Sequence, residues 1–546
     1  MFLDARKLPP GTQIETDVCV VGAGAAGITL ALEFADGPFR VCLVESGGLG
    51  FEKSTQDLYR GDSVGLPYFA LRQARMAGFG GSTGVWAGWC RPLDGIDLEA
   101  RDWVPHSGWP FDSAHLDPFY ARAHPLCQLG PYVYAPEAWE TERARRLPLE
   151  TPQLTTSVFQ ISPPTRFGDL YRHRIERSNN IQTLLHANVL ELEATDFRAG
   201  VTRVRAATLD GKTFSIAAKL FILAAGGLEN PRLLLLSDGG GRTALGNEHG
   251  LVGRFFGEHP YIDSGSFILS DPRLQLGFYY PRRIGGTDAT RVRGVFSLAE
   301  ATLRREKLVN CSILFRPKHE SHAAYRAPGV EALRQLWEIW RSKDVPTGLA
   351  RLVRGMLSDI DKVAVSAYRR AFVGDDEPVD HVRVRTCVES VPNPESRVTL
   401  TGERDRLGRR AIRLDWKLDG LEMKSIRRAH ELLDAGLRGA GLGRLEVNLE
   451  PGASGWPPSM VAGRHHMGTT RMHRDPRQGV VDEHGRVHGL SNLFVTGSSV
   501  FPSTGYVNPT LTIVALALRL ADHVKRVMAS LPEAVEIGSA PQSRGR

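Results

Sequence analysis

Three polar side chains in the last quarter of the chain have the types that proton chemistry on an alcohol requires. His465, His466 and Asn508 are expected on loops that flank a short apolar strand, residues 493–495. An imidazole titrates near neutral pH and can take a proton from a hydroxyl group, and a carboxamide can hold the same hydroxyl by hydrogen bonds. Because His465 and His466 are adjacent, they would point apart on a regular element. A histidine on a loop is also what an ordinary surface carries, so these residues alone leave catalysis open.

The element that would bring a cofactor to these groups lies near the start of the chain. Residues 16–48 read TDVCVVGAGAAGITLALEFADGPFRVCLVESGG, which predicts strand, glycine turn, helix, strand and acid. Gly22 permits the tight turn, Gly24 lets backbone N–H groups approach a pyrophosphate, and Gly27 lets the helix pack closely on the strand. Glu45 can accept hydrogen bonds from a ribose diol and would repel a 2′-phosphate, which disfavours NADP. The sequence therefore predicts a dinucleotide site, although the turn alone cannot distinguish NAD from FAD.

The hydrophobic pattern further along predicts two kinds of sheet. Residues 219–236 indicate a buried strand and then a helix that starts near Pro231, a residue suited to a first helical turn. Residues 181–193 indicate strand, turn and strand. Residues 381–390 alternate with period two, as a half-buried antiparallel strand does, and residues 396–417 indicate a hairpin.

Residues 331–370 have the spacing of an amphipathic helix, with arginines between the apolar positions. The favoured interpretation is a helical insertion that packs on its own protein. The alternative is a contact for a second subunit, an electron-acceptor protein or a membrane surface.

Composition excludes several classes of protein. The 546 residues carry a net charge of +7, from 68 basic and 61 acidic residues that are interleaved, which disfavours a nucleic-acid binder. The six cysteines form no CxxC pair and no Cys/His cluster, so no metal is expected. No run reaches eighteen apolar residues, and the N-terminus lacks the layout of a signal peptide. The prediction is a soluble, cytoplasmic protein without a membrane span.

A series of motifs in order resembles the glucose-methanol-choline (GMC) oxidoreductases, flavoenzymes that oxidise alcohols. The resemblance covers most of the chain and is carried by GAGAAG with Glu45, GGSTGVW at 80–86, SGWP at 107–110, LAAGGLENPRLLLLS at 223–237, VGRFFGEHP at 252–260, PNPESRVTL at 392–400, HHMGTTRM at 465–472 and GSSVFPSTGYVNPTLT at 497–512. Within the family, these motifs most resemble the branch of pyranose oxidases, glycoside 3-oxidases and sugar dehydrogenases.

The resemblance implies roles for individual residues. The family's H-x-x-G-T histidine corresponds to His465, the second catalytic position corresponds to Asn508, and His466 is interpreted as structural. In fungal pyranose oxidases a histidine just before the tryptophan bonds to the flavin; here Val85 stands there, so FAD is expected to be non-covalent. The residues expected to bind FAD are Gly22, Ala23, Gly24, Ala26, Gly27, Glu45, Ser46, Gly80, Gly81, Ser82, Thr83, Val85, Trp86, Val189 (at the adenine), Ala225, Gly226, Gly497, Ser498, Pro509 and Thr510.

The resemblance also implies the architecture, an α/β fold in which a Rossmann-type FAD-binding domain is interleaved with an α+β substrate domain on an antiparallel sheet. The expected segments are FAD-binding at 1–110, connecting at 111–180, FAD-binding at 181–262, substrate-binding at 263–454 with a helical insertion at 320–375, FAD-binding with the catalytic loops at 455–528, and a disordered tail at 529–546.

The leading hypothesis is an FAD-dependent oxidase or dehydrogenase that acts on a sugar-like alcohol. In it His465 is the base as hydride passes to flavin N5. The substrate stays open among free sugars, glycosides, aminoglycosides and other alcohols, as do the acceptor (oxygen, quinone or redox protein) and the formation of a homo-oligomer. The rivals are an NAD-dependent dehydrogenase, a flavin-containing lyase of the same fold, and a subunit that mainly docks to an electron-transfer partner.

Overall fold

The computed structural model describes residues 1–546 except 164, 196–198, 240–242, 286–288, 317–380, 453 and 531–546. The helix expected over 331–370 and the tail expected to be disordered therefore lie outside the described residues, apart from the first two residues of the tail.

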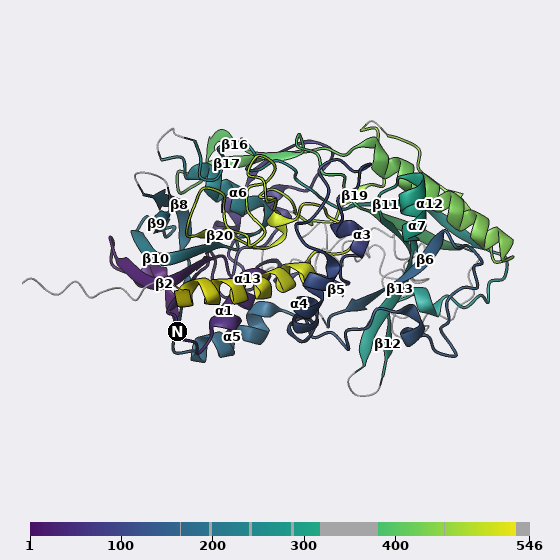
Figure 1. Cartoon of the computed structure of the whole chain (residues 1–546), viewed down its shortest axis with the longest axis horizontal. Helices are drawn as coiled ribbons and strands as arrows, with labels where there is room; N and C mark the ends of the chain where they lie inside the picture. The colour runs from purple at the N-terminus through teal and green to yellow at the C-terminus, as the bar shows by residue number, and fades with distance from the viewer. Residues whose placement is uncertain are drawn as a thin grey trace, which may run out of the picture.

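An eight-stranded sheet occupies one end of the molecule (Figure 1). Its order is β1 (Phe2–Asp4), β7 (Ile181–Leu185), β3 (Val41–Val44), β2 (Gln13–Val21), β10 (Thr213–Leu223), β9 (Val201–Ala207) and β8 (Asn188–Ala194), and β20 (Leu493–Val495) pairs with the last residues of β10. Neighbouring strands from β1 to β10 pair in parallel, as do β10 and β20, whereas β9 pairs antiparallel with both β10 and β8. The sheet thus joins segments from both ends of the chain.

The central strands are buried because helices cover the sheet. Every residue of β3 and the last six residues of β2 are buried. Helices α1 (Ala25–Phe34) and α13 (Thr510–Ser530) contact each other, and α13 also contacts α4 (Ser113–Leu126) (Figure 1). Parallel strands that are buried on both faces require the continuous apolar runs seen in the sequence. The predicted α/β fold with a Rossmann-type sheet is confirmed.

A nine-stranded antiparallel sheet lies towards the other end of the molecule (Figure 1). Its order is β18 (Gly443–Val447), β11 (Pro260–Leu269), β15 (His381–Val388), β14 (Cys311–Phe315), β13 (Thr290–Leu298), β6 (Leu154–Ile161) and β5 (Trp89–Cys90), with β12 (Arg282–Ile284) on β13 and β19 (Val461–Ala462) on β11. Val382 and Val384 of β15 share a hydrophobic cluster with Ile426 and Leu433 of α12 (Gly420–Gly439). The alternating pattern of β15 therefore places its arginines on the opposite face of the sheet.

The remaining elements connect these sheets. The hairpin predicted within 396–417 is present as β16 (Arg397–Arg404) and β17 (Arg410–Trp416), and β4 (Gly61–Gly65) adds a third, parallel strand. The other helices are α2 (Lys53–Gln56), α3 (Gly95–Leu98), α5 (Phe167–Arg177), α6 (Gly226–Leu236) and α7 (Glu300–Glu306).

The predicted start of the helix after β10 is wrong. Helix α6 begins at Gly226, so Pro231 lies inside it rather than in its first turn. A proline there has no N–H to donate to the carbonyl four residues earlier, which belongs to Gly227. The Thr469 hydroxyl donates to that carbonyl instead, at 2.6 Å. A side chain from a distant loop thus satisfies the carbonyl, which local sequence cannot reveal.

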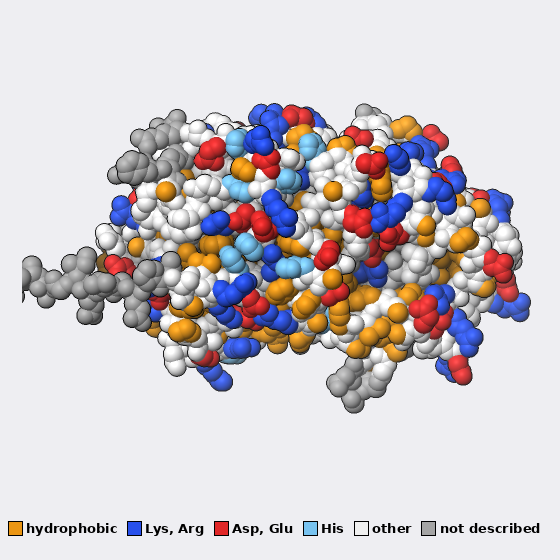
Figure 2. Space-filling view, in the orientation of Figure 1, with side chains coloured by type: hydrophobic (Ala, Val, Ile, Leu, Met, Phe, Trp, Pro, Cys, Tyr) orange, Lys and Arg blue, Asp and Glu red, His pale blue; other side chains and the backbone are white. Residues whose placement is uncertain are grey.

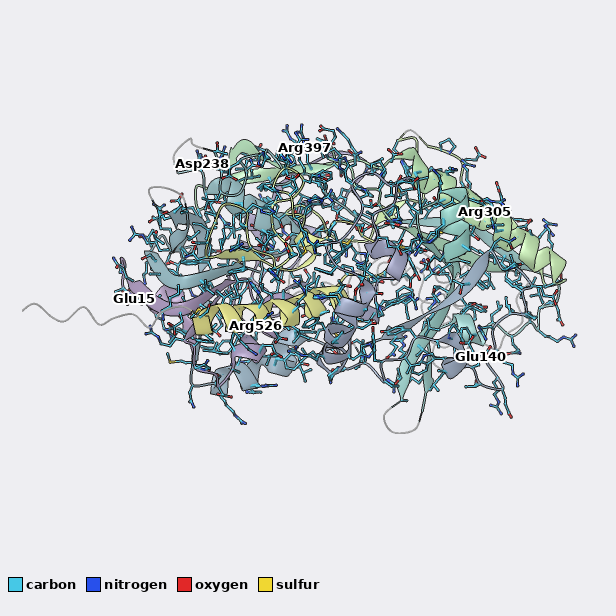
Figure 3. The ribbon with its side chains drawn as sticks, in the orientation of Figure 1. Glu15, Glu140, Asp238, Arg305, Arg397 and Arg526 are labelled. Carbon is cyan, nitrogen blue, oxygen red and sulfur yellow. The ribbon has the colours of Figure 1, made fainter. Side chains whose placement is uncertain are left out.

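Charged side chains of both signs are distributed over the surface. Basic and acidic side chains are interspersed over the face drawn in Figure 2. In Figure 3, Arg526 lies on α13 inside the outline, whereas the other labelled charged residues lie nearer its edge. Within the described ranges, no helix has both the length and the apolar character needed to cross a membrane. All six cysteines are buried and unpaired.

Candidate active site

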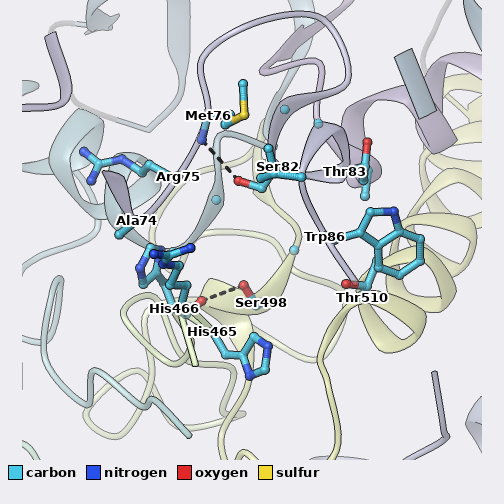
Figure 4. Close-up of a pocket in the computed structure, with 18 of the residues that line it drawn as sticks. Ala74, Arg75, Met76, Ser82, Thr83, Trp86, His465, His466, Ser498 and Thr510 are labelled. Atoms are coloured by element: carbon cyan, nitrogen blue, oxygen red, sulfur yellow. Dashed lines mark hydrogen bonds between the residues drawn. The ribbon is translucent and has the colours of Figure 1, made fainter. Parts of the chain in front are cut away.

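A cavity of about 670 Å³ is lined by residues of both large sheets (Figure 4). Of the residues expected at the cofactor or the chemistry, those lining it are Gly22, Gly24, Ala26, Glu45, Ser46, Gly81, Ser82, Thr83, Val85, Trp86, Val189, Ala225, Gly226, His465, Gly497, Ser498, Asn508, Pro509 and Thr510. Ala23, Gly27 and Gly80 lie behind the wall. The tertiary structure therefore brings nearly all of the expected residues to one cavity.

Glycine is present at positions 22, 24 and 27 of the first turn for different structural reasons. A Cβ at Gly22 would lie 2.7 Å from the Ala224 carbonyl oxygen, and one at Gly27 would lie 1.8 Å from the Gly22 carbonyl oxygen. Gly22 also has φ +103°, which glycine adopts without strain. A Cβ at Gly24, by contrast, would meet nothing within 4 Å. Gly22 and Gly27 are required by packing, whereas Gly24 leaves space in the cavity beside the N-terminus of α1, where an anionic group is stabilised.

Glu45 ties together three segments of the cavity wall. One carboxylate oxygen accepts the backbone N–H of Ala23 at 2.9 Å, and the other accepts those of Gly47 at 2.9 Å and Gly78 at 3.0 Å. Burial raises the pKa of Glu45, and the backbone donors act in the opposite direction. Glu45 therefore braces the glycine turn and the loop before residue 80 in addition to facing the cavity.

His465 is held by contacts on both ring nitrogens and on its backbone. Its Nδ1 lies 2.9 Å from Nδ1 of His259, and its Nε2 lies 3.2 Å from Nδ2 of Asn508. Its backbone N–H donates to Glu258 at 2.8 Å. Burial, together with His259 and His466, holds the pKa of His465 well below its ordinary value. His465 is therefore neutral at neutral pH.

The partners of the two rings assign their protons. Nε2 of His259 lies 2.8 Å from the Gly505 carbonyl oxygen, which can only accept, so His259 carries its proton on Nε2. Nδ1 of His259 is then an acceptor, and His465 must donate to it from Nδ1–H. The remaining nitrogen of His465, Nε2, has a lone pair, to which the Asn508 amide donates. When a hydroxyl group takes the place of the amide on this lone pair, the nitrogen can accept the hydroxyl proton.

Sequence reasoning assigned no role to Glu258 or His259. Both belong to the quoted segment VGRFFGEHP. Burial raises the pKa of Glu258 to about 7, although Tyr68 and the backbone N–H groups of His465 and His259 donate to its carboxylate. No spacing rule connects positions 259 and 465. The place of Glu258 and His259 in the segment VGRFFGEHP was therefore the only feature of the sequence that pointed to them.

His466 also reaches the cavity. Its carbonyl accepts the Ser498 hydroxyl at 2.6 Å (Figure 4), and its ring lies near those of Tyr68 and Phe256. Burial, with the charges of Arg75 and Arg464, lowers the pKa of His466 to about 3. Its buried Nε2 makes no hydrogen bond with the part of the chain that the structure describes. A polar ligand could satisfy this atom.

Comparisons with known proteins show which family and which relatives the chain is similar to. Residues 392–517 match the family described as GMC oxidoreductase. The chain is 25% identical to the fructose dehydrogenase large subunit of Gluconobacter japonicus over 333 residues, which are 60% of this chain and 51% of that protein. It is 26% identical to the paromamine 6′-oxidase of Streptomyces fradiae over 313 residues, 57% of this chain and 46% of that protein. The matched regions thus span about half the length of these relatives.

One solved structure shows the shared fold. A formate oxidase variant of Aspergillus oryzae aligns with a TM-score of 0.53 at 17% identity, over 95% of this chain and 99% of that chain. Its likeness extends through both large sheets and supports the assignment of the fold.

Proposed function

We propose that the chain is a GMC oxidoreductase that oxidises a CH–OH group of a sugar or glycoside to the carbonyl with FAD as cofactor. The observation that carries this proposal is the lone pair on Nε2 of His465, at the cavity that the glycine turn also lines. A protein that only bound a dinucleotide would not need a neutral base held in one tautomer there.

The cavity wall fits a flat, extended dinucleotide. A Cβ at Gly24, Gly226 or Gly497 would meet nothing within 4 Å, so at all three positions the wall leaves space that a ligand can fill. Glu45 would accept from the adenosine ribose, and the 80–86 loop and Thr510 would contact the rest of the cofactor. Val85 carries no nucleophilic atom, so FAD would be held without a covalent bond. When bound, the flavin supplies a ring that accepts a hydride from the substrate carbon.

The residues around His465 would handle the proton. The substrate hydroxyl gives its proton to Nε2 while the hydrogen on carbon leaves as hydride. The alcohol thus loses a proton from its oxygen and a hydride from its carbon, and it becomes a carbonyl. The protonated ring keeps its Nδ1–H bond to His259. The Asn508 amide, which lies 3.2 Å from Nε2, would give up this position to the substrate hydroxyl and hold the substrate oxygen instead. An acceptor such as dioxygen or a quinone takes the two electrons in a second half-reaction.

The sugar-like substrate is supported by the relatives. One is named a fructose dehydrogenase subunit and the other a paromamine oxidase, and both names describe oxidation of sugar-type compounds. Analogy of this kind supports a substrate class but not one compound.

The test is anaerobic mixing of the yellow protein with a panel of free sugars, glycosides, aminoglycosides and simple alcohols. Loss of the flavin absorbance with a sugar-type alcohol, and formation of its carbonyl product, are expected. Acid precipitation should release the FAD into the supernatant. A protein without flavin, or one whose flavin no alcohol reduces, as in a lyase of this fold, would contradict the proposal.

A further inference from the structure

The nine-stranded sheet contributes arginines to the cavity wall. Arg293, Arg316 and Arg385 line the cavity from this sheet, and Arg464 lines it from the loop before His465. The carboxylates that line the same cavity, Glu45 and Glu229, belong instead to the side of the glycine turn and α6. Arg75 and Arg409 also line that side, where they pair with Glu229 and Asp405, so the excess of positive charge lies on the side of the nine-stranded sheet and Arg464.

Strand register explains why these arginines share one face. Leu314 of β14 is opposite Arg385 of β15, so both side chains point to the same side, and Arg316 and Arg383 follow two residues away on that side. The alternate residues Val382 and Val384 pack into the cluster that includes α12. The apolar residues of β15 thus face the core, and its arginines face the cavity side.

The carboxylate of Asp263 pairs with three arginines on this face of the sheet. Asp263 accepts from Arg385 Nε at 2.7 Å and from Arg383 at 2.8 Å, and Arg316 lies 3.7 Å away. Burial alone would raise the pKa of Asp263, but the hydrogen bond and charge of Arg385 and the charges of Arg383 and Arg316 hold it below its ordinary value. Arg316 and Arg383 make further contacts. Asp263 is thus fully engaged, and it leaves the two terminal NH2 groups of Arg385 without a hydrogen bond to any described residue.

Arg464 is a second guanidinium without an acid partner among the described residues. It is exposed, has φ +64°, and lies with its guanidinium 4.1 Å from the centre of the Phe69 ring. A left-handed backbone is uncommon for a residue with a side chain and carries a conformational cost. Arg464 directly precedes His465 in the chain, lines the same cavity, and its charge helps to lower the pKa of His466.

We propose that the substrate carries a carboxylate or phosphate group and that Arg385 and Arg464 bind it. Arginine matches both groups through two parallel N–H donors, and such charge-assisted bonds are stronger than neutral ones. The same charges repel a cationic substrate, so the chain would differ in preference from its paromamine-oxidising relative. This inference rests on the proposed function, whose sugar-type alcohol it narrows to an acidic one.

The experiment compares matched substrates on the holoenzyme under anaerobic conditions. The pairs are methyl glucoside with methyl glucuronoside for the carboxylate, and glucose with glucose 6-phosphate for the phosphate, with paromamine as the cation. We expect kcat/KM for one acidic member to exceed that for its neutral partner by about tenfold or more, and the difference to shrink as salt is added. Paromamine should be the poorest substrate.

Variants locate the preference. Arg385→Gln and Arg464→Gln should each reduce the acid-to-neutral ratio by about tenfold, and Arg385→Lys should keep part of it. Because Arg464 is exposed, its replacement does not disturb the packed sheet. The matched control is Arg413→Gln, an exposed arginine paired with Asp62 on the three-stranded sheet, which should leave the ratio unchanged.

The outcomes separate the two proposals. Equal rates for all pairs, a preference for paromamine, or an unchanged ratio in both glutamine variants would overturn the anionic substrate while leaving alcohol oxidation intact. Calorimetric binding of the glucuronoside that is lost in Arg385→Gln, without reduction of the flavin by any alcohol, would support the arginine site and contradict the proposed function.

Discussion

The Nδ1 atoms of His259 and His465 lie 2.9 Å apart, although 206 positions separate the two residues in the chain. The Gly505 carbonyl fixes the proton of His259 on its far nitrogen, so His259 accepts from His465 and keeps the outer nitrogen of His465 unprotonated. His259 thus acts through His465 as a positioning residue and does not need to touch the substrate.

We expect His259→Phe, which removes the acceptor but retains a ring, to slow flavin reduction about 10–100-fold because His465 can then adopt the wrong tautomer. His259→Gln should restore part of the rate, since its amide oxygen can accept from Nδ1–H. The measurement is stopped-flow reduction at saturating substrate, with FAD content as the control for folding. Equal rates of flavin reduction in His259→Phe and His259→Gln would show that His259 only fills space beside His465.

His465→Ala should slow reduction by roughly 10²–10⁴-fold, equivalent to about 3–5 kcal/mol in the barrier, because it removes the proposed base. Asn508→Ala should cost less, since it removes one orienting hydrogen bond. FAD content should stay normal in both. His173→Ala is the matched control, because His173 is exposed on α5. A rate that survives in His465→Ala would place the base elsewhere.

The pH dependence of reduction should lack an inflection at the ordinary histidine pKa of 6.5. A base whose pKa is lowered stays unprotonated to more acidic pH, so the loss of rate caused by protonation of His465 should occur only below pH 6.5. An inflection near pH 7, if observed, belongs to Glu258, whose pKa burial raises to about 7. Glu258→Gln should abolish that inflection and leave the acid limb in place. An acid limb centred at 6.5 would show that His465 is more exposed to water than the structure indicates.

Glu45→Ala should weaken FAD retention by about 1–3 kcal/mol and also lower the melting temperature of the apoprotein. The second effect follows because Glu45 accepts three backbone N–H groups from different segments. Dialysis against bromide followed by titration with FAD measures the affinity for FAD. Calorimetry of the apoprotein measures its melting temperature. Glu15→Ala, at an exposed position on β2, is the control. Weaker FAD binding with an unchanged apoprotein would assign Glu45 to the ribose alone.

Glu422→Gln should stabilise the protein at pH 8. Glu422 is fully buried on α12, one of its oxygens has no partner among the described residues, and burial raises its pKa from 4.5 to about 8. The folded state therefore binds this proton more tightly than the unfolded state, so the contribution of Glu422 is most favourable below pH 4.5 and is lost as the pH rises towards 8. The loss is of order 3–5 kcal/mol. Unfolding in urea at pH 5 and pH 8 tests this; equal stabilities of the variant and the parent at pH 8 would contradict it.

The sequence by itself determined the features that depend on neighbouring residues. The strand, glycine turn and helix of residues 16–34 follow from local periodicity, and the positive φ of Gly22 and the contact of Gly27 with the Gly22 carbonyl lie within that unit. The hairpin within 396–417 is local in the same sense. Motif order added His465 and Asn508 as the groups for the chemistry. None of these inferences required knowledge of how distant segments pair.

Only the tertiary structure decided the features that depend on pairing between distant strands and loops. The register of β11 against β15 places Asp263 opposite Arg385, and no pattern along either strand states which residues will be opposed. The contact of His259 with His465 depends likewise on the pairing of β11 with β19, because His259 directly precedes β11 and His465 lies three residues after β19. The start of α6 was misplaced for the same reason, because the Thr469 hydroxyl that satisfies the Gly227 carbonyl lies 242 positions away. Hydrogen bonds and charges act over a few ångströms in space, whereas a sequence pattern reports only distance along the chain.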